Sequence, residues 1–396
     1  MTNRLYYTEP YRTEFDATVV AVDTGDGCAH VTLDQTAFYP TSGGQPFDTG
    51  TLGGGAVSEV IDREDGTIAH VTSGSPRVGE AVRGVIDWAR RFDHMQQHTG
   101  QHVLSAAFDR LFGVRTESFH MGTLSATIDL AREVSAAEVA KAEGEANRIV
   151  WEDRPVTIRF ANADEAARMP LRKESIRTGP LRLIDVEDFD LSACGGTHVA
   201  RTGAIGVIAI GGWEKFRGGS RVEFLCGGRA LNRFRLWRDS LAATQKFLSV
   251  APEEMAAAVE RMQGDSKAQQ RTLRGFQEKL AAHEARALLE KAGARAVIVE
   301  ALEGWDAQGL KAIAVAAAAG NPNAVVALFS TTTPALVVIA RGQAATADAG
   351  AMLRSLVAQF GGKGGGKPDL AQGGGLSGSQ AQLTKAIEGL LAQAPE

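Results

Sequence analysis

Two pairs of metal-binding side chains stand far apart in this sequence, and the members of each pair are four residues apart. His98 and His102 would share one face of a helix, because positions i and i+4 of an α-helix are neighbours. Cys194 and His198 enclose two glycines, which suits a tight loop around an ion. Three imidazoles and one thiolate form a donor set that suits tetrahedral zinc. The sequence therefore predicts one Zn²⁺ per chain, bound by these four side chains.

The alternative for each pair is an ordinary structural role, since many histidines at this spacing lie on helix surfaces or in cores. The chain has only 3 cysteines and 8 histidines, so the presence of both pairs favours the metal. No glutamate follows His98, which excludes the H-E-x-x-H pattern of metalloproteases. His94 continues the row by another four residues. We expect it to support a ligand or to lie on the helix surface rather than to bind metal.

Length and composition limit the class of protein. The 396 residues suffice for two or three domains. No run approaches the roughly 18 apolar residues that suggest a membrane helix, and the N-terminus lacks a signal-peptide core, so we expect a cytoplasmic protein. Three cysteines argue against a disulfide framework and leave Cys194 available as a thiolate. The net charge of −5 gives no general sign of nucleic-acid binding, which would need a local basic patch.

Hydrophobic patterns in the first part of the chain predict an α+β fold. Residues 1–88 alternate short apolar runs with Gly and Asp, which indicates a β-rich subdomain that closes as a small β-barrel. Residues 89–228 form a two-layer α/β part with the zinc ligands. In this part, Ser135 and Glu138 have the spacing of a capping box at a helix start. The apolar face of the helix 90–112 is predicted to consist of Val103, Leu104, Ala107, Phe108 and Leu111.

The remaining residues divide into a helical and a mixed segment. The hydrophobic pattern of residues 229–293 predicts a helical hairpin or coiled-coil linker. A seam with alternating spacings of three and four runs through Val259, Met262, Ser266, Gln269, Leu273, Phe276 and Leu280. The seam could pair with the preceding helix or with a second chain, so a homodimer through the helical or C-terminal region stays open. Residues 294–396 combine continuous apolar strands with helices, which indicates a C-terminal α/β domain with a buried sheet.

A glycine-rich segment lies near the end of the chain, at residues 361–375. No Gly-Lys-Ser/Thr opens a helix there, so the segment is not a Walker A loop. Such a run is either a flexible loop or a bare backbone surface that phosphates can approach. In the second case Lys363 and Lys367 supply the charge.

Three motifs, in this order, resemble the editing domain of alanyl-tRNA synthetases. They are the segment 36–50, the pair His98 and His102, and the run from Cys194 to His198. The helical section and glycine-rich tail resemble the C-terminal domain of the same enzymes, which DHH-type phosphoesterases also carry. Only 35 residues precede Thr36, so we expect no counterpart of the aminoacylation domain. The chain therefore resembles the freestanding trans-editing proteins called AlaX, in their long form.

This resemblance implies an activity. An aminoacyl-tRNA deacylase, a carboxylic ester hydrolase, would remove the amino acid from mischarged tRNA(Ala), chiefly Ser-tRNA(Ala) and also Gly-tRNA(Ala). The resemblance suggests tRNA and ATP binding but no amino-acid activation. If all four ligands bind zinc at once, the shell is closed, as in a structural site. Zinc would then act after one ligand leaves, or would only orient the substrate.

Three residues are candidates for contacts to the aminoacyl end. Thr36 stands where the family places a hydroxyl that faces the amino-acid side chain, and a hydrogen bond to serine would favour it over alanine. The alternative for Thr36 is the role of an ordinary strand residue. Gln45 could contact the ribose or the carbonyl, or only support a turn. His120 stands where the synthetases often carry Gln, so we expect a polar contact to substrate.

A cluster of cations precedes the second ligand pair and predicts contacts to tRNA phosphates, at Arg168, Arg172, Lys173, Arg177 and Arg182. The alternative is a solvated charged surface. The partner that the resemblance implies is the acceptor end of tRNA(Ala). Two other functions stay open: a zinc-dependent hydrolase of small esters or amides, and a non-catalytic tRNA-binding protein with structural zinc.

Overall fold

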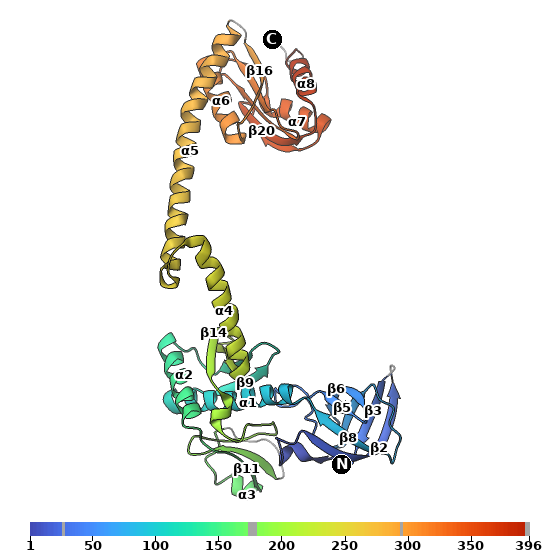
Figure 1. The fold of residues 1–396 in the computed structure, drawn as a ribbon. Helices are drawn as coiled ribbons and strands as arrows, with labels where there is room; N and C mark the ends of the chain where they lie inside the picture. Colours follow the sequence, from blue (N-terminus) through green and yellow to red (C-terminus); the bar gives the residue numbers. More distant parts are fainter. Residues whose placement is uncertain (26–27, 173–179, 294–295, 393–396) are drawn as a thin grey trace. The chain divides into compact units, whose positions relative to one another are not determined.

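The computed structural model describes residues 1–25, 28–172, 180–293 and 296–392. The chain forms two compact units, Met1–Thr244 and Gln245–Glu396 (Figure 1). Within the described ranges, no α-helix combines the length and the hydrophobicity that crossing a lipid bilayer requires.

Six strands of the first unit close into a small β-barrel, as the sequence predicts. In barrel order they are β2 (Glu14–Gly25), β3 (Cys28–Leu33), β7 (Ile68–Thr72), β6 (Gly55–Asp62), β5 (Gly50–Leu52) and β8 (Ala81–Ile86). The barrel is drawn in blue in Figure 1. Its interior is filled by apolar side chains such as Val31, Leu52 and Ile68. Two short strands, β1 (Asn3–Arg4) and β4 (Gln35–Thr36), pair with each other in parallel.

A buried histidine in the barrel makes the stability of the first unit depend on pH. His70 of β7 has its Nδ1 atom 2.9 Å from the carbonyl oxygen of Val31 and its Nε2 atom 2.8 Å from the hydroxyl of Thr36. Burial lowers the pKa of His70 from 6.5 to about 4. The unfolded chain therefore takes up this proton at a higher pH than the folded chain. The free energy of unfolding should fall by about 3 kcal/mol as the pH drops from 6.5 to about 4.

Urea denaturation at neutral and at mildly acidic pH measures this effect. The variant His70→Gln should lose stability less steeply with falling pH than the wild type. His120→Gln, which removes an exposed histidine, should keep the wild-type dependence. The same pH dependence in all three proteins would show that His70 is not the group that titrates.

The rest of the first unit packs helices against two antiparallel sheets. One sheet has the strand order β14 (Ile208–Phe216), β15 (Gly219–Cys226), β10 (Ala126–Leu130) and β9 (Thr116–Met121). The other has the order β11 (Val156–Ala161), β12 (Leu181–Val186) and β13 (Asp190–Ala193). Helices α1 (Trp88–Phe112) and α2 (Ala136–Trp151) share one hydrophobic core with both sheets. A single short turn, α3 (Ala163–Ala166), follows β11.

Local sequence sets the ends of these helices. The carboxylate of Asp87 accepts a hydrogen bond from the backbone N–H of Arg90 at 3.2 Å and caps the start of α1. Gly113 ends α1 with a left-handed φ of 63°. The capping box predicted at the start of α2 is present. The predicted apolar face of α1 is buried except for Leu111, which is 45% exposed in the last turn.

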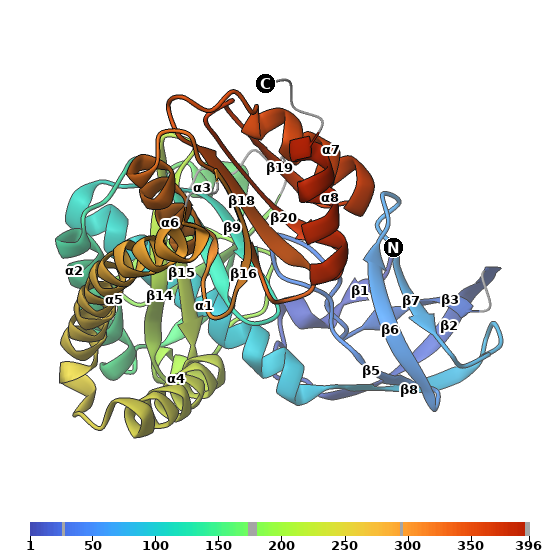
Figure 2. The same cartoon turned by 90° about the horizontal axis from the view of Figure 1, so that it is seen from above.

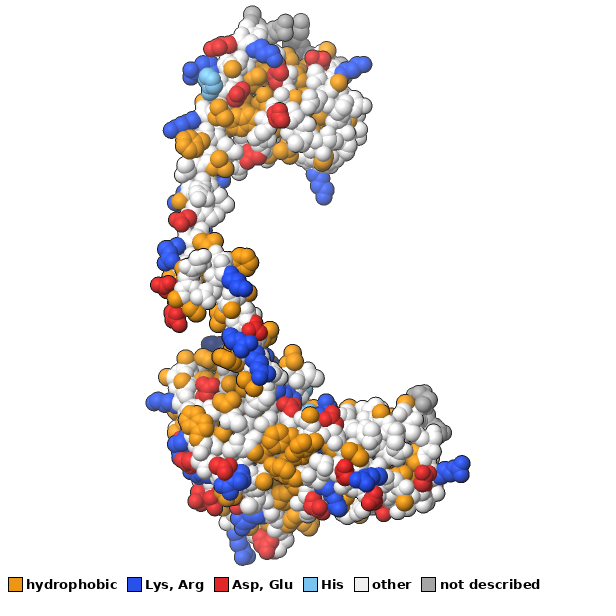
Figure 3. All heavy atoms as spheres, viewed as in Figure 1, with side chains coloured by type: hydrophobic (Ala, Val, Ile, Leu, Met, Phe, Trp, Pro, Cys, Tyr) orange, Lys and Arg blue, Asp and Glu red, His pale blue; other side chains and the backbone are white. Residues whose placement is uncertain are grey.

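Two long helices, α4 (Gly227–Leu248) and α5 (Met255–Ala292), confirm the predicted helical region. The pairing of the two as a hairpin stays a prediction. On α5, the apolar residues of the predicted seam are between 42% and 63% exposed: Val259, Met262, Leu273, Phe276 and Leu280. Figure 3 accordingly has orange hydrophobic side chains at the surface of this helix.

The second unit is a five-stranded sheet with helices on both faces. Its strand order is β16 (Val297–Leu302), β17 (Val325–Ser330), β18 (Ala335–Arg341), β20 (Leu370–Leu376) and β19 (Lys363–Gly366). Helices α5 and α6 (Ala307–Gly320) pack on one face. Helices α7 (Ala349–Phe360) and α8 (Gln380–Ala392) pack on the other (Figure 2).

The glycine-rich segment is not the flexible loop that its composition allows. It forms the antiparallel hairpin of β19 and β20. A Cβ atom on Gly364 would lie 2.6 Å from Cα of Gly373, and one on Gly373 would lie 3.1 Å from Leu353 of α7. The glycines therefore allow two strands and a helix to approach closely. Lys363 and Lys367 are exposed at this edge of the sheet.

Candidate metal centre and active site

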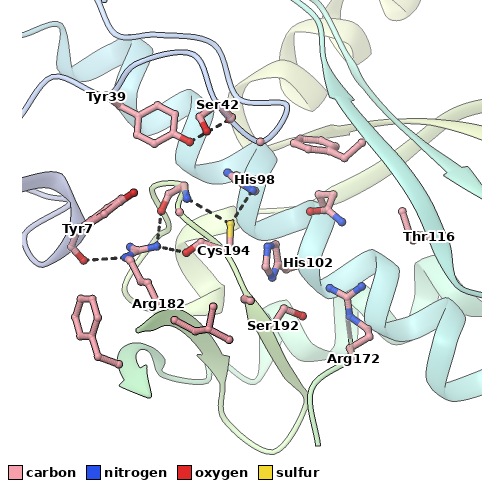
Figure 4. Close-up of a pocket in the computed structure, with 18 of the residues that line it drawn as sticks. Tyr7, Tyr39, Ser42, His98, His102, Thr116, Arg172, Arg182, Ser192 and Cys194 are labelled. Atoms are coloured by element: carbon pink, nitrogen blue, oxygen red, sulfur yellow. Dashed lines mark hydrogen bonds between the residues drawn. The ribbon is translucent and has the colours of Figure 1, made fainter. Parts of the chain in front are cut away.

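Helix α1 and the loop after β13 bring the four predicted zinc ligands together. His98 and His102 lie one turn apart on α1, and Cys194 and His198 lie in the loop. Their ligand atoms all lie within 4.8 Å of one another. The Cys194 sulphur is 3.3 Å from Nε2 of His98 (Figure 4). It is 3.4 Å from Nε2 of His198. Folding thus forms one compact cluster from the two halves of the predicted set.

Each imidazole of the cluster is held through its Nδ1 atom by a polar partner outside the cluster. Such partners fix the orientation of the ring and leave Nε2 free for a metal. They are Gln45 for His98 at 2.8 Å, Asp190 for His102 at 3.0 Å and Thr99 for His198 at 3.2 Å. Three oriented imidazoles and a thiolate are a donor set that fits Zn²⁺.

The charges in the cluster favour a thiolate at Cys194. Burial works to raise the pKa of its thiol, but the three neighbouring histidines outweigh burial and hold the pKa well below its usual value. For His102, burial works to lower the pKa, but the hydrogen bond to Asp190 and the Cys194 sulphur raise it to about 9. The thiolate is the form that binds metal, so these neighbours favour the ligating form of Cys194.

The buried carboxylate of Asp190 connects the cluster to an arginine. Asp190 accepts hydrogen bonds from Nε of Arg172 at 2.6 Å and from the hydroxyl of Ser192 at 3.0 Å. A buried carboxylate needs such a partner charge. Arg172 is therefore engaged in an ion pair behind His102, which differs from the predicted contact to a tRNA phosphate.

Arg182 also has an environment unlike that expected of a phosphate-binding cation. Its side chain is buried and donates to the carbonyl oxygens of Tyr7 at 2.9 Å, Cys194 at 2.7 Å and Gly196 at 2.9 Å (Figure 4). These bonds fix the ligand loop, so Arg182 shapes the metal site rather than the surface. Among the other predicted cations, Arg168 is exposed, and Lys173 and Arg177 lie outside the described residues.

The two glycines of the ligand loop differ in the space around them. A Cβ atom on Gly196 would lie 2.1 Å from Cε1 of His98, whereas one on Gly195 would meet nothing nearer than the Tyr7 hydroxyl at 3.6 Å. We expect Gly196→Ala to displace His98 and to lower zinc affinity by about tenfold to a hundredfold, the range for disturbed ligand partners. Gly195→Ala should retain the affinity. Zinc titration against a chelator measures both, and equal affinities would contradict the steric argument.

The three residues predicted to contact substrate lie in different environments. Gln45 is buried and donates to the hydroxyl of Thr197 at 2.8 Å, so it joins the ligand loop to His98. Thr36 is buried, and its hydroxyl forms a hydrogen bond with the His70 ring. His120 is exposed on β9. Neither Thr36 nor His120 is among the described residues that line the cavity beside the cluster. A role of either at the substrate stays a prediction.

A cavity of about 550 Å³ lies beside the cluster in the first unit. This volume falls in the range of small-molecule sites. Its wall includes three of the four cluster residues, His98, His102 and Cys194. Other parts of the wall come from two segments near the N-terminus, with Tyr7 and Tyr39, and from β9, with Thr116, Ser118 and Phe119.

Several residues of the site carry no recognisable signal in the sequence. Thr99 and Asp190 hold ligands, yet neither belongs to a spacing pattern, since their partners are distant in the chain. His94 is buried and lies outside the candidate cluster. Of its two predicted positions, the one on the helix surface is therefore wrong, and support of a ligand stays a prediction. Burial and the nearby Arg90 and Arg229 lower the pKa of His94 to about 3, which keeps it neutral.

Three family profiles match parts of the chain. Residues 9–90 match tRNA synthetases class II (A), and residues 181–223 match the threonyl and alanyl tRNA synthetase second additional domain. Residues 294–393 match the DHHA1 domain. The second profile covers strand β12 and the ligand loop, and the third covers the sheet of the second unit.

Individual relatives match nearly the whole chain. The alanine–tRNA ligases of Pyrococcus abyssi and Natronomonas pharaonis are 34% and 37% identical over 94% of this chain. The chain spans 42% of the length of each ligase. The alanyl-tRNA editing protein AlaX-L of Pyrococcus horikoshii is 30% identical over 94% of this chain and 94% of its own length. The chain therefore belongs to the family of the alanyl-tRNA editing protein AlaX-L.

Proposed function

We propose that this chain is an aminoacyl-tRNA deacylase that removes serine, and secondarily glycine, from mischarged tRNA(Ala). One observation carries the proposal: a zinc-type His and Cys cluster in the wall of a cavity, in a relative of an alanyl-tRNA editing protein. The matches give no support to the predicted ATP binding.

The chemistry needs little more than positioning. An aminoacyl ester is an activated bond, so orientation and polarisation of its ends suffice. A zinc ion held by the four cluster residues would supply positive charge at the ester end. Thr116 and Ser118 line the same cavity, and their hydroxyl oxygens could accept a hydrogen bond from a serine side chain. Alanine offers no such donor, which gives the required direction of selectivity.

A deacylation assay tests this function directly. The purified chain should hydrolyse Ser-tRNA(Ala) and leave Ala-tRNA(Ala) intact, and an excess of uncharged tRNA should compete. A small-ester hydrolase would be indifferent to the competing tRNA. Binding of Ser-tRNA(Ala) without turnover would instead favour a non-catalytic tRNA-binding protein.

For the tRNA body, we propose contacts from exposed cations of both units, Arg168 and the hairpin residues Lys363 and Lys367. Replacing both lysines by alanine should weaken tRNA binding and flatten its salt dependence by about one unit of slope per lysine, because each phosphate contact releases counterions. Lys311→Ala, on exposed α6 surface, is the matched control. Filter binding over a series of salt concentrations measures the slope, and an unchanged slope in the double variant would remove these lysines from the tRNA surface.

A further inference from the structure

Phe160 is the last of three alternate apolar residues on one face of β11, and it lies beyond the hydrophobic core. Val156, Ile158 and Phe160 alternate along the strand and so lie on one face of the sheet. Val156 and Ile158 pack into the main core of the first unit. Phe160 follows them in the row, yet its side chain is 55% exposed. A large apolar surface is thus left uncovered at the end of an otherwise buried row.

The exposed ring belongs to the cavity beside the metal cluster. Phe160 is a lining residue of that cavity, and its partner across the antiparallel pair is Arg182. Directly paired residues have Cβ atoms about 5 Å apart on the same face. Arg182 in turn donates to the carbonyl oxygens of Cys194 and Gly196. One cross-strand step therefore separates the ring from the loop that carries a candidate metal ligand.

The cavity consequently has two chemically different parts. The cluster side offers imidazoles, a thiolate and hydroxyl groups, which suit a polar ester end. The β11 side offers an aromatic face at the edge of a sheet, beside the exposed Pro180. Aromatic faces that line a polar site are the usual platforms for unpaired nucleic-acid bases.

We propose that Phe160 is the stacking platform for the terminal adenine of the aminoacyl-tRNA. The proposal rests on the function proposed above. The ester to be cleaved joins the amino acid to the ribose of that adenosine, so the base must lie one sugar away from the reacting carbonyl. Stacking on Phe160 would hold the base while the ester reaches the cluster. All tRNAs end in this adenosine, so the contact supplies affinity and position but no discrimination between tRNAs.

Two small substrates separate base stacking from every other effect of Phe160. One is the seryl ester of adenosine, and the other is the seryl ester of methyl riboside, which lacks the base. In Phe160→Ala, kcat/KM for the adenosine ester should fall about tenfold or more, within the range for loss of one base stack. The riboside ester should be hydrolysed as by the wild type, and Phe160→Trp should restore the adenosine ester. Trp151→Ala, which removes a 74% exposed aromatic outside the cavity, is the matched control.

The outcomes are distinct. A selective loss on the adenosine ester in Phe160→Ala supports the stacking role. An equal loss on both esters assigns the ring to the support of the site and overturns the proposal, as does no loss on either. If the wild type cleaves neither ester nor Ser-tRNA(Ala), the proposed function fails, and the stacking role falls with it. A wild type that cleaves both esters with equal kcat/KM keeps the function and overturns the stacking role alone.

Discussion

Cys194→Ala is expected to lose zinc and deacylation together. The sulphur is the common neighbour of His98 and His198, at 3.3 Å and 3.4 Å from their Nε2 atoms. The neighbouring histidines hold the pKa of its thiol well below the usual value, which favours the anionic thiolate. Mutation of a residue that hydrogen-bonds to a metal ligand typically lowers metal affinity or activity by about tenfold to a hundredfold. Removal of a ligand itself should therefore lower zinc affinity and deacylation by about a hundredfold or more.

Zinc content after dialysis and the rate of Ser-tRNA(Ala) deacylation measure the two effects. Cys28→Ala is the matched control, because Cys28 is an exposed free cysteine of the barrel. If Cys194→Ala retained zinc, the proposed donor set would be wrong. If it lost zinc and kept full activity, the metal would be structural and the cavity would act without it.

The second large effect is expected from Asp48→Ala, which should destabilise the first unit by about 3–5 kcal/mol. Asp48 and Arg91 form an ion pair in which both side chains have 0% exposure. Nε of Arg91 lies 3.0 Å from the Asp48 carboxylate, and the same carboxylate accepts from the backbone N–H of Tyr39 at 2.6 Å. Removing the carboxylate leaves the buried guanidinium without its counter-charge and the backbone N–H of Tyr39 without its acceptor.

The position of this pair explains why it matters for the site. Arg91 lies on α1, about two helix turns before His98 of the cluster. It also donates to the carbonyl oxygens of Pro10 and Ala37. It thereby ties the helix of the ligands to the segment 36–50. Urea denaturation measures the loss, with Glu14→Ala as control, since its ion pair with Arg83 is exposed and should add little. Equal stability of the two variants would contradict the burial argument.

Local spacing predicted those features that depend on neighbours in the chain. The i, i+4 histidines of α1, the gathering of Cys194 and His198 beside them, and the capping box of α2 all appear as expected. The barrel followed from short alternating runs of apolar residues. In each case one short segment contains most of the physical information, because hydrogen bonds and periodicity act over a few residues.

Features that depend on burial could not be predicted in this way. Arg172 and Arg182 look like a basic cluster in the sequence, but one neutralises Asp190 and the other binds the carbonyl groups of the ligand loop. The glycine-rich segment looks like a loop, but closely packed neighbours make it a hairpin. A run of charged residues or glycines in the sequence does not indicate which distant residues will contact it in the folded chain.

The sequence by itself determined which four side chains form the candidate metal cluster, because ligand chemistry and spacing are local properties. Only the tertiary structure decided which atoms orient them, since Gln45, Thr99 and Asp190 reach the imidazoles through contacts between distant segments. It also decided that Phe160 would remain uncovered beside the cavity. Exposure is a property of the whole packed chain, so no pattern along β11 could reveal it.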